Sequence, residues 1–235
     1  MRALAITLCM LAAAPSGAEE HTFTGFARDL DSGALLYVET HEIRGAGGSG
    51  EQRTVLYRRD EAAQPFARKS LTYGSDRTRP SFRFADERSG FVESVVAVPG
   101  GFEVQCRAGA KATVRTSVIP SEAVAVIDAG FDEFVRANWA RLQSGAGINA
   151  PFLVPSRLGA IDFRVRKASE TRIEGDPASV IRLSLAGPLG WLLPDIEVTY
   201  RNSDRRLMRY RGLTNIRDAD GDLITAQIDF PDPPS

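Results

Sequence analysis

The chain has 235 residues, with 29 Lys and Arg against 30 Asp and Glu, so its formal net charge is −1 at pH 7. Proteins that bind nucleic acids usually carry an excess of basic residues, and this chain has none. We therefore expect no nucleic-acid partner and no electrostatic attraction to anionic lipid surfaces. The length is sufficient for a single domain to bury its own core.

The first 18 residues have the pattern of an export signal. Arg2 provides a short positive region, residues 3–14 are apolar, and small residues precede a cleavage site before Glu19. This apolar run is too short to span a bilayer, which needs roughly 20 residues. We therefore expect residues 1–18 to be a removed signal peptide and residues 19–235 to be a single β-rich domain. The mature protein would then be periplasmic, without a transmembrane segment.

The first half of the remaining chain alternates apolar and polar residues with a period of two. Phe102, Val104 and Cys106, for example, alternate with Glu, Gln and Arg. Successive side chains of a strand point to opposite faces, so each such segment predicts a strand with one buried face. The predicted strands are 23–28, 34–43, 54–58, 66–73, 81–85, 91–98, 102–107 and 113–118.

The pattern changes once, near the middle of the chain. Phe131, Val135, Trp139 and Leu142 recur at helical spacing, which predicts one amphipathic helix over 129–143. Asp128 is the expected N-cap of this helix. The aromatic stripe must pack against an apolar surface, and the concave face of a curved sheet would provide one.

Strands then resume to the end of the chain. About a dozen strands with one helix favour a mostly β protein, namely a strongly curved antiparallel sheet or half-barrel with the α-helix packed in its concave side. The strands predicted in this second half are 148–154, 161–167, 180–185, 196–201, 207–213 and 223–230.

One segment interrupts the alternation with consecutive apolar residues. Residues 187–194 are flanked by Gly and Pro and could close over an apolar cavity, although they could equally plug the end of the sheet as ordinary core. The helix would provide a second tryptophan to such a cavity. The candidate ligand-binding residues are Trp139, Phe152, Trp191, Leu192 and Leu193.

Glu39 and His41 lie on one face of a predicted strand, about 7 Å apart along it. They could form an acid–base pair or half of a metal site, or they could simply face solvent. A metal needs three or four ligands, and the only other histidine, His21, is near the N-terminus. We therefore expect no metal and no cofactor.

Further charged residues lie in or next to strands whose other residues are apolar. They could converge with Glu39 and His41 on one polar site, or they could form ion pairs that brace the rim of the sheet. These residues are Lys69, Asp86, Arg88, Glu93 and Arg157.

Two resemblances follow from these residues. Phe-Ala-Arg-Lys at 66–69, Asp-Glu-Arg-Ser-Gly at 86–90, Asp-Ala-Gly-Phe-Asp at 128–132 and Phe-Leu-Val-Pro-Ser-Arg at 152–157 resemble uncharacterised exported proteins of Gram-negative bacteria. Residues 196–200, 207–215 and 223–230 are similar in pattern to the lipoprotein carriers LolA and LolB. The second resemblance implies a half-barrel with a helix in its concavity that shelters acyl chains.

Three functions are consistent with these observations. The first is non-enzymatic binding of an apolar or lipid-like ligand in a cavity between the sheet and the helix. The second is a structural or envelope-assembly role, with a protein partner and no small ligand. The third is a hydrolase or lyase that uses Glu39, His41, Lys69 or Asp86, which would require these side chains to meet in one pocket.

Overall fold

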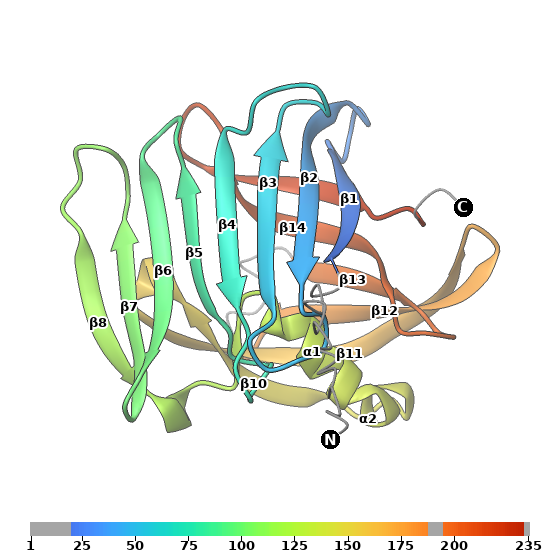
Figure 1. Cartoon of the computed structure of the whole chain (residues 1–235). Helices are drawn as coiled ribbons and strands as arrows, with labels where there is room; N and C mark the ends of the chain where they lie inside the picture. The colour runs from blue at the N-terminus through green and yellow to red at the C-terminus, as the bar shows by residue number, and fades with distance from the viewer. Residues whose placement is uncertain (1–19, 188–194, 233–235) are drawn as a thin grey trace, which may run out of the picture.

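The computed structural model describes residues 20–187 and 195–232 (Figure 1). The predicted signal peptide, residues 1–18, lies outside these ranges, as do Trp191, Leu192 and Leu193. No helix among the described residues is both long enough and apolar enough to cross a membrane.

Fifteen strands form one sheet over the described residues, in the order β8-β7-β6-β5-β4-β3-β2-β1-β15-β14-β13-β12-β11-β10-β9. Neighbouring strands are consecutive in the chain at every position except one, where β1 pairs with β15. The pairing is antiparallel apart from the short parallel contact of β9 with β10. The strands are β1 (Glu20–Arg28), β2 (Leu35–Arg44), β3 (Gln52–Arg58), β4 (Ala67–Thr72), β5 (Ser81–Asp86), β6 (Phe91–Val98), β7 (Gly101–Arg107), β8 (Arg115–Pro120), β9 (Val126–Ile127), β10 (Ile148–Val154), β11 (Gly159–Ile173), β12 (Asp176–Leu185), β13 (Ile196–Arg201), β14 (Leu207–Arg217) and β15 (Leu223–Asp229).

The sheet bends into two layers. Strands β1–β8 form the first layer, and β10–β15 form the second, whose strands cross behind the first (Figure 1). The seam between the layers is short, because β1 and β15 share only the three pairs from Phe26↔Asp229 to Arg28↔Gln227. The outer strands β8 and β9 do not pair with each other in the described sheet, which is therefore curved but unclosed.

The prediction of a mostly β protein with a curved antiparallel sheet is confirmed, but its strand count was too low. The period-two pattern predicted β6, β10 and β13 with their observed bounds, but it predicted β11, β12 and β14 too short. Strand β9 has only two residues, Val126 and Ile127, and so has no alternation to detect. It follows a 3-10 turn, η1 (Ser121–Ala123), in the connection between the layers.

The single helix predicted over 129–143 is two helices in the described structure, α1 (Gly130–Ala137) and α2 (Trp139–Gln143). The break is at Asn138, whose φ of −100° and ψ of 14° are not helical. Its side-chain amide donates a 2.9 Å hydrogen bond to the carbonyl oxygen of Phe134. Asparagine competes in this way for backbone groups that a continuous helix would use, which explains the break.

Both helices pack against the second layer. Phe134, Val135, Trp139 and Leu142 are buried in one cluster with residues of β10–β13. A second and larger cluster joins the two layers, because it includes Phe82 and Phe84 of the first layer together with Leu153 and Ile228 of the second. The two helices thus cover only part of the second layer.

The start of α1 is also held against the first layer. The amide of Ile127 donates a 3.0 Å hydrogen bond to the carbonyl oxygen of Thr78, in the connection between β4 and β5. A Cβ atom at Gly130 would lie 2.0 Å from the same oxygen, so this close approach requires glycine. The segment before α1 therefore has a fixed position between the layers.

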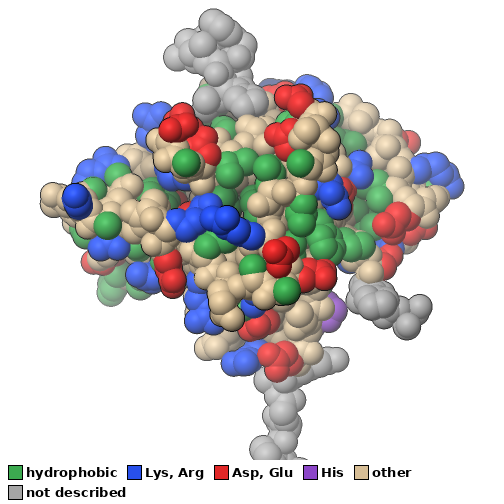
Figure 2. Space-filling view, turned by 90° about the horizontal axis from the view of Figure 1, so that it is seen from above, with side chains coloured by type: hydrophobic (Ala, Val, Ile, Leu, Met, Phe, Trp, Pro, Cys, Tyr) green, Lys and Arg blue, Asp and Glu red, His purple; other side chains and the backbone are tan. Residues whose placement is uncertain are grey.

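The surface carries no strong imbalance of charge in the view from above. Figure 2 shows acidic and basic side chains interspersed with hydrophobic ones on this face. This distribution agrees with the near-neutral composition of the chain.

Candidate functional site

A cavity of about 1080 Å³ lies between the two layers. This is slightly larger than the roughly 300–1,000 Å³ that is typical of small-molecule sites. Its lining comes from both layers and from the start of α1, and the two walls differ in chemistry. The first layer and the α1 segment provide most of its charged residues, whereas the second layer provides mainly apolar ones.

The charged wall follows from strand alternation and register. In β2, Glu39, His41 and Ile43 share the inner face and line the cavity. Across the sheet, His41 is opposite Val55, which is opposite Lys69. The same row continues through Phe84 to Glu93. Polar and apolar side chains therefore alternate from strand to strand, which separates the charges of this row.

Lys69 forms a buried ion pair in this wall. Its Nζ donates to Oδ1 and Oδ2 of Asp128 at 2.9 and 2.8 Å, and both side chains are about nine-tenths buried. Asp128 also accepts hydrogen bonds from the Ala129 amide and from the Asn215 side chain. The carboxylate thus connects the first layer, the segment before α1 and the second layer.

Asp128 is not the N-cap of α1, contrary to the sequence interpretation. Ala129 occupies the N-cap position without a side-chain hydrogen bond, and Asp128 has a positive φ of 44°. Asp and Asn tolerate this left-handed conformation better than most residues. It aims the Asp128 carboxylate at Lys69 rather than along the helix.

Glu39 and His41 are in direct contact within the wall. Their side chains meet at 3.1 Å between Nε2 and Oε2, although their positions in the strand are separated by one residue. Burial is the main cause that lowers the pKa of His41, against the opposing effect of Glu39. The imidazole is therefore neutral at pH 7, and Phe23 stacks on it at 4.4 Å between ring centroids.

A second group of charges lies where the wall approaches α1. Glu51 is almost fully buried and accepts hydrogen bonds from the Gly47 amide, Arg53 and Arg77. Burial alone would raise the pKa of Glu51, but the Gly47 amide and the two guanidinium groups outweigh it and lower the pKa. Arg77 also pairs with Glu133 of α1 at 2.9 Å. These charges are thus mutually compensated.

The wall of the second layer is mostly apolar. Phe152 of β10 contacts Phe163 of β11 at 5.2 Å and Phe131 of α1 at 5.7 Å between ring centroids. Leu183, Ile196 and Val198 extend this surface across β12 and β13. An apolar group of a ligand would find its contacts on this side.

Glu93 is a residue of the charged wall with a strongly raised pKa. Burial, and then the charge of Asp128, raise the pKa of its carboxyl to about 7, although Lys69 and Arg217 act in the opposite direction. Glu93 forms no ion pair within 4.0 Å in the described part of the chain. It is therefore partly protonated near neutral pH.

The structure brings some of the predicted residues to the cavity and not others. Glu39, His41, Lys69 and Phe152 line it, whereas Trp139, Asp86, Arg88 and Arg157 lie outside the lining. Trp191, Leu192 and Leu193 lie outside the described residues.

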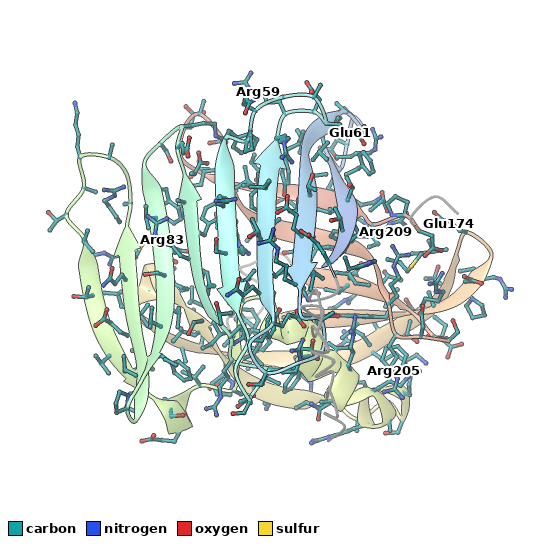
Figure 3. The ribbon with its side chains drawn as sticks, in the orientation of Figure 1. Arg59, Glu61, Arg83, Glu174, Arg205 and Arg209 are labelled. Carbon is teal, nitrogen blue, oxygen red and sulfur yellow. The ribbon has the colours of Figure 1, made fainter. Side chains whose placement is uncertain are left out.

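Trp139 packs away from the cavity. Its ring meets Tyr200 of β13 edge-on at 6.1 Å, and Arg205 lies 5.9 Å from the ring centroid. Figure 3 shows Arg205 beside α2, at the lower right of the molecule. The helical stripe therefore anchors α2 on the sheet.

Asp86 and Arg88 form a separate pair. The Arg88 guanidinium contacts Asp86 at 2.5 Å, lies 4.0 Å from the Phe66 ring centroid and donates to the carbonyl oxygen of Arg217. Arg157 is exposed in a 3-10 turn, η2 (Pro155–Arg157). Asp86 therefore does not meet Glu39, His41 and Lys69 in the lining of the cavity.

Several lining residues were not identified from the sequence as site candidates. They come from separate strands and loops, and only Asp128 had been singled out, as a helix cap. These residues include Glu51, Arg53, Tyr57, Asp128, Tyr210 and Asn215.

Comparison with known proteins identifies the fold without identifying a family. No protein-family model and no curated protein matches the sequence. The structure is similar to that of a β-barrel-like protein of the domain of unknown function DUF1849 from Brucella abortus, with a TM-score of 0.51 and 12% identity over 92% of this chain and 98% of that chain. At this identity the similarity establishes a shared fold alone.

Two further structures match less closely. One is an outer membrane lipoprotein-sorting protein domain from Vibrio parahaemolyticus, with a TM-score of 0.28 and 7% identity over 92% of this chain and 84% of that one. The other is a DUF1329 family protein from Desulfovibrio piger, with a TM-score of 0.29 and 10% identity over 93% and 85% of the two chains. Similarity at these TM-scores supports no argument about function.

Replacing Lys69 with Met would leave the Asp128 carboxylate buried without its cation. We expect the free energy of unfolding, measured by urea denaturation, to fall by about 3 kcal/mol. The double variant Lys69→Met/Asp128→Asn should recover most of this loss, because no unpaired charge remains. Lys111→Met, at an exposed position, is the matched control and should change stability by less than about 0.5 kcal/mol. Additive losses in the double variant would contradict the pairing.

Glu93 makes stability depend on pH in a predictable direction. Its pKa is raised from 4.5 to about 7 in the folded protein, so between these values the folded state binds more protons than the unfolded state. The contribution of Glu93 to stability is therefore largest below the lower value and is lost as pH rises through the higher one. Glu93→Gln should remove this decline in urea unfolding measured across the interval, whereas Glu103→Gln should retain it. An unchanged decline in Glu93→Gln would rule out Glu93 as its source.

Proposed function

We propose that this chain binds an apolar or lipid-like ligand in the cavity between its two layers, without catalysing a reaction on it, and that it does so in the periplasm. The observation that carries the proposal is the cavity itself, at about 1080 Å³. Its second-layer wall is apolar and extends across four strands, which suits a hydrocarbon group. The export pattern of residues 1–18 supports the location.

The charged residues of the cavity support binding better than catalysis. Most of the cations are held by carboxylates, as in the pairs of Lys69 with Asp128 and Arg77 with Glu133. The neutral His41 contacts Glu39, but no Ser, Thr or Cys side chain forms a hydrogen bond with either residue in the described structure. The arrangement therefore lacks an activated nucleophile of the kind that hydrolases use.

Native mass spectrometry of the mature protein, purified from the periplasm of its source, tests this proposal. We expect a bound apolar molecule that organic extraction recovers. Phe163→Asp places a charge on the apolar wall at a half-buried position and should abolish co-purification. Ser184→Asp introduces the same charge on the opposite face of the second layer and should leave the ligand in place. An apo mass for the unaltered protein, together with no binding of added aliphatic probes, would refute the proposal.

A second candidate function is interaction with an envelope protein, and the outer strand β8 favours it. Val96, Val114 and Val118 are among the exposed large hydrophobic residues, and Val118 is 62% exposed. Val96 of β6 and Val118 of β8 both lie opposite Glu103, which is on the strand between them, β7. An open edge strand with apolar side chains can pair with a strand of another protein.

A photo-crosslinking residue at position 118 tests this second function in the periplasm of the source organism. If β8 docks a partner, one protein should be crosslinked reproducibly from this position. Position 83 is the control, because Arg83 lies on β5, which β6 and β7 separate from the edge strand β8 (Figure 3). No adduct at 118, or the same adducts at both positions, would count against docking at β8.

A further inference from the structure

Glu39 is a buried carboxylate that faces the cavity without a cationic partner. The residue is 8% exposed, and its carboxylate contacts only the neutral His41 among the groups that form ion pairs in the described structure. The neighbouring cations already form ion pairs with other carboxylates, since Lys69 pairs with Asp128 and Arg53 pairs with Glu51. A buried charge without compensation is costly, so this position would gain from an external cation.

The surroundings of Glu39 are aromatic. Tyr57 lies directly opposite it in the register of β2 and β3. Phe23 stacks on His41, and Phe230 lies edge-on to both rings, 6.0 Å from Phe23 and 5.8 Å from His41. These side chains all line the cavity. Aromatic rings near a carboxylate favour alkylammonium groups, because the ring faces attract a cation while the carboxylate supplies the opposite charge.

The tyrosines near Glu39 add no negative charge of their own. Burial, followed by the charge of Glu39, raises the pKa of Tyr57 and of Tyr210 well above the usual range. Both hydroxyls therefore stay protonated at neutral pH. The charge of Asp128 also acts on both tyrosines, but Lys69 neutralises it. Among the described residues, this leaves Glu39 as the carboxylate beside these rings without a cationic partner, which matches a ligand with a single positive charge.

An apolar path leads away from this position. Tyr210 of β14 lies opposite Val198 of β13, and Leu183 of β12 lies opposite Ile196. Adjacent strands are about 4.8 Å apart, so the path extends across the second layer for the length of a medium aliphatic chain. The charged end and the apolar path belong to one continuous cavity.

We infer that the ligand is a cationic amphiphile, with an alkylammonium head group beside Glu39 and an aliphatic chain on the second layer. This inference deepens the proposed function and rests on it. The pairing of Glu39 with the head group would replace the missing cation, and Phe23, Tyr57 and Phe230 would surround its methyl or methylene groups. A neutral alcohol would gain only the apolar contacts, and a carboxylate would be repelled.

Isothermal titration calorimetry of the delipidated full-length mature protein tests the inference with three probes of equal chain length. These are decyltrimethylammonium and decanoate, each below its critical micelle concentration, and 1-decanol below its solubility limit in water. We expect the unaltered protein to bind the ammonium at least about tenfold more tightly than the alcohol, and the carboxylate more weakly than either. Glu39→Gln should lose this preference while it retains affinity for the alcohol. Glu42→Gln, on the opposite face of the same strand, should keep the preference.

The outcomes separate the inference from the proposed function. Equal affinity of the unaltered protein for the ammonium and the alcohol would overturn the inference and leave the proposed function standing. A preference that persists in Glu39→Gln would overturn it as well. If none of the three probes binds to the unaltered protein, the proposed function fails. The comparison of the three probes uses the unaltered protein alone, so it tests the inference even if Glu39→Gln does not fold.

Discussion

The buried pair of Lys69 and Asp128 connects the parts of the structure that surround the cavity. Lys69 belongs to the first layer, Asp128 immediately precedes the helical segment, and Asn215 binds the same carboxylate from the second layer. A buried charge pair tolerates little change in geometry, because each partner is costly to leave alone. The pair therefore acts as a spacer that holds the layers at a defined separation. The hydrogen bond from Ile127 to Thr78 and the close approach of Gly130 act at the same place.

The two walls of the cavity differ in polarity because the helices cover part of one layer and not the other. The helices bury part of the second layer with apolar side chains, so the remaining exposed strip of that layer is apolar too. The first layer has no helix on this part of its inner face among the described elements, and it carries charges in a row spaced by Val55 and Phe84. The cavity is therefore amphiphilic, with an apolar wall from the layer that the helices cover and a charged wall from the layer that they leave uncovered.

Much of the fold could be predicted from the sequence, because alternation reports which side of a strand is buried. Glu39 and His41 were placed on one face for this reason, and they do share the cavity wall. The pairing of Lys69 with Asp128 could not be predicted, since the two residues are 59 positions apart in the chain and strand alternation does not indicate which residues meet between layers. The helical stripe indicated burial of Trp139 correctly, but periodicity cannot distinguish a surface of packed side chains from a cavity. For Trp139 the partner is Tyr200.

The order of the strands has a consequence for how the chain reaches this structure. Each layer is built from neighbours in sequence, so its strand pairs need only short loops to close. The seam of β1 with β15 is the exception, because it joins opposite ends of the chain through three residue pairs. Bringing the two ends of the chain together costs conformational entropy, and three residue pairs offset only a small part of this cost. The strand order therefore lets each layer form as a meander of its own, and the sheet is made continuous where the two ends of the chain meet.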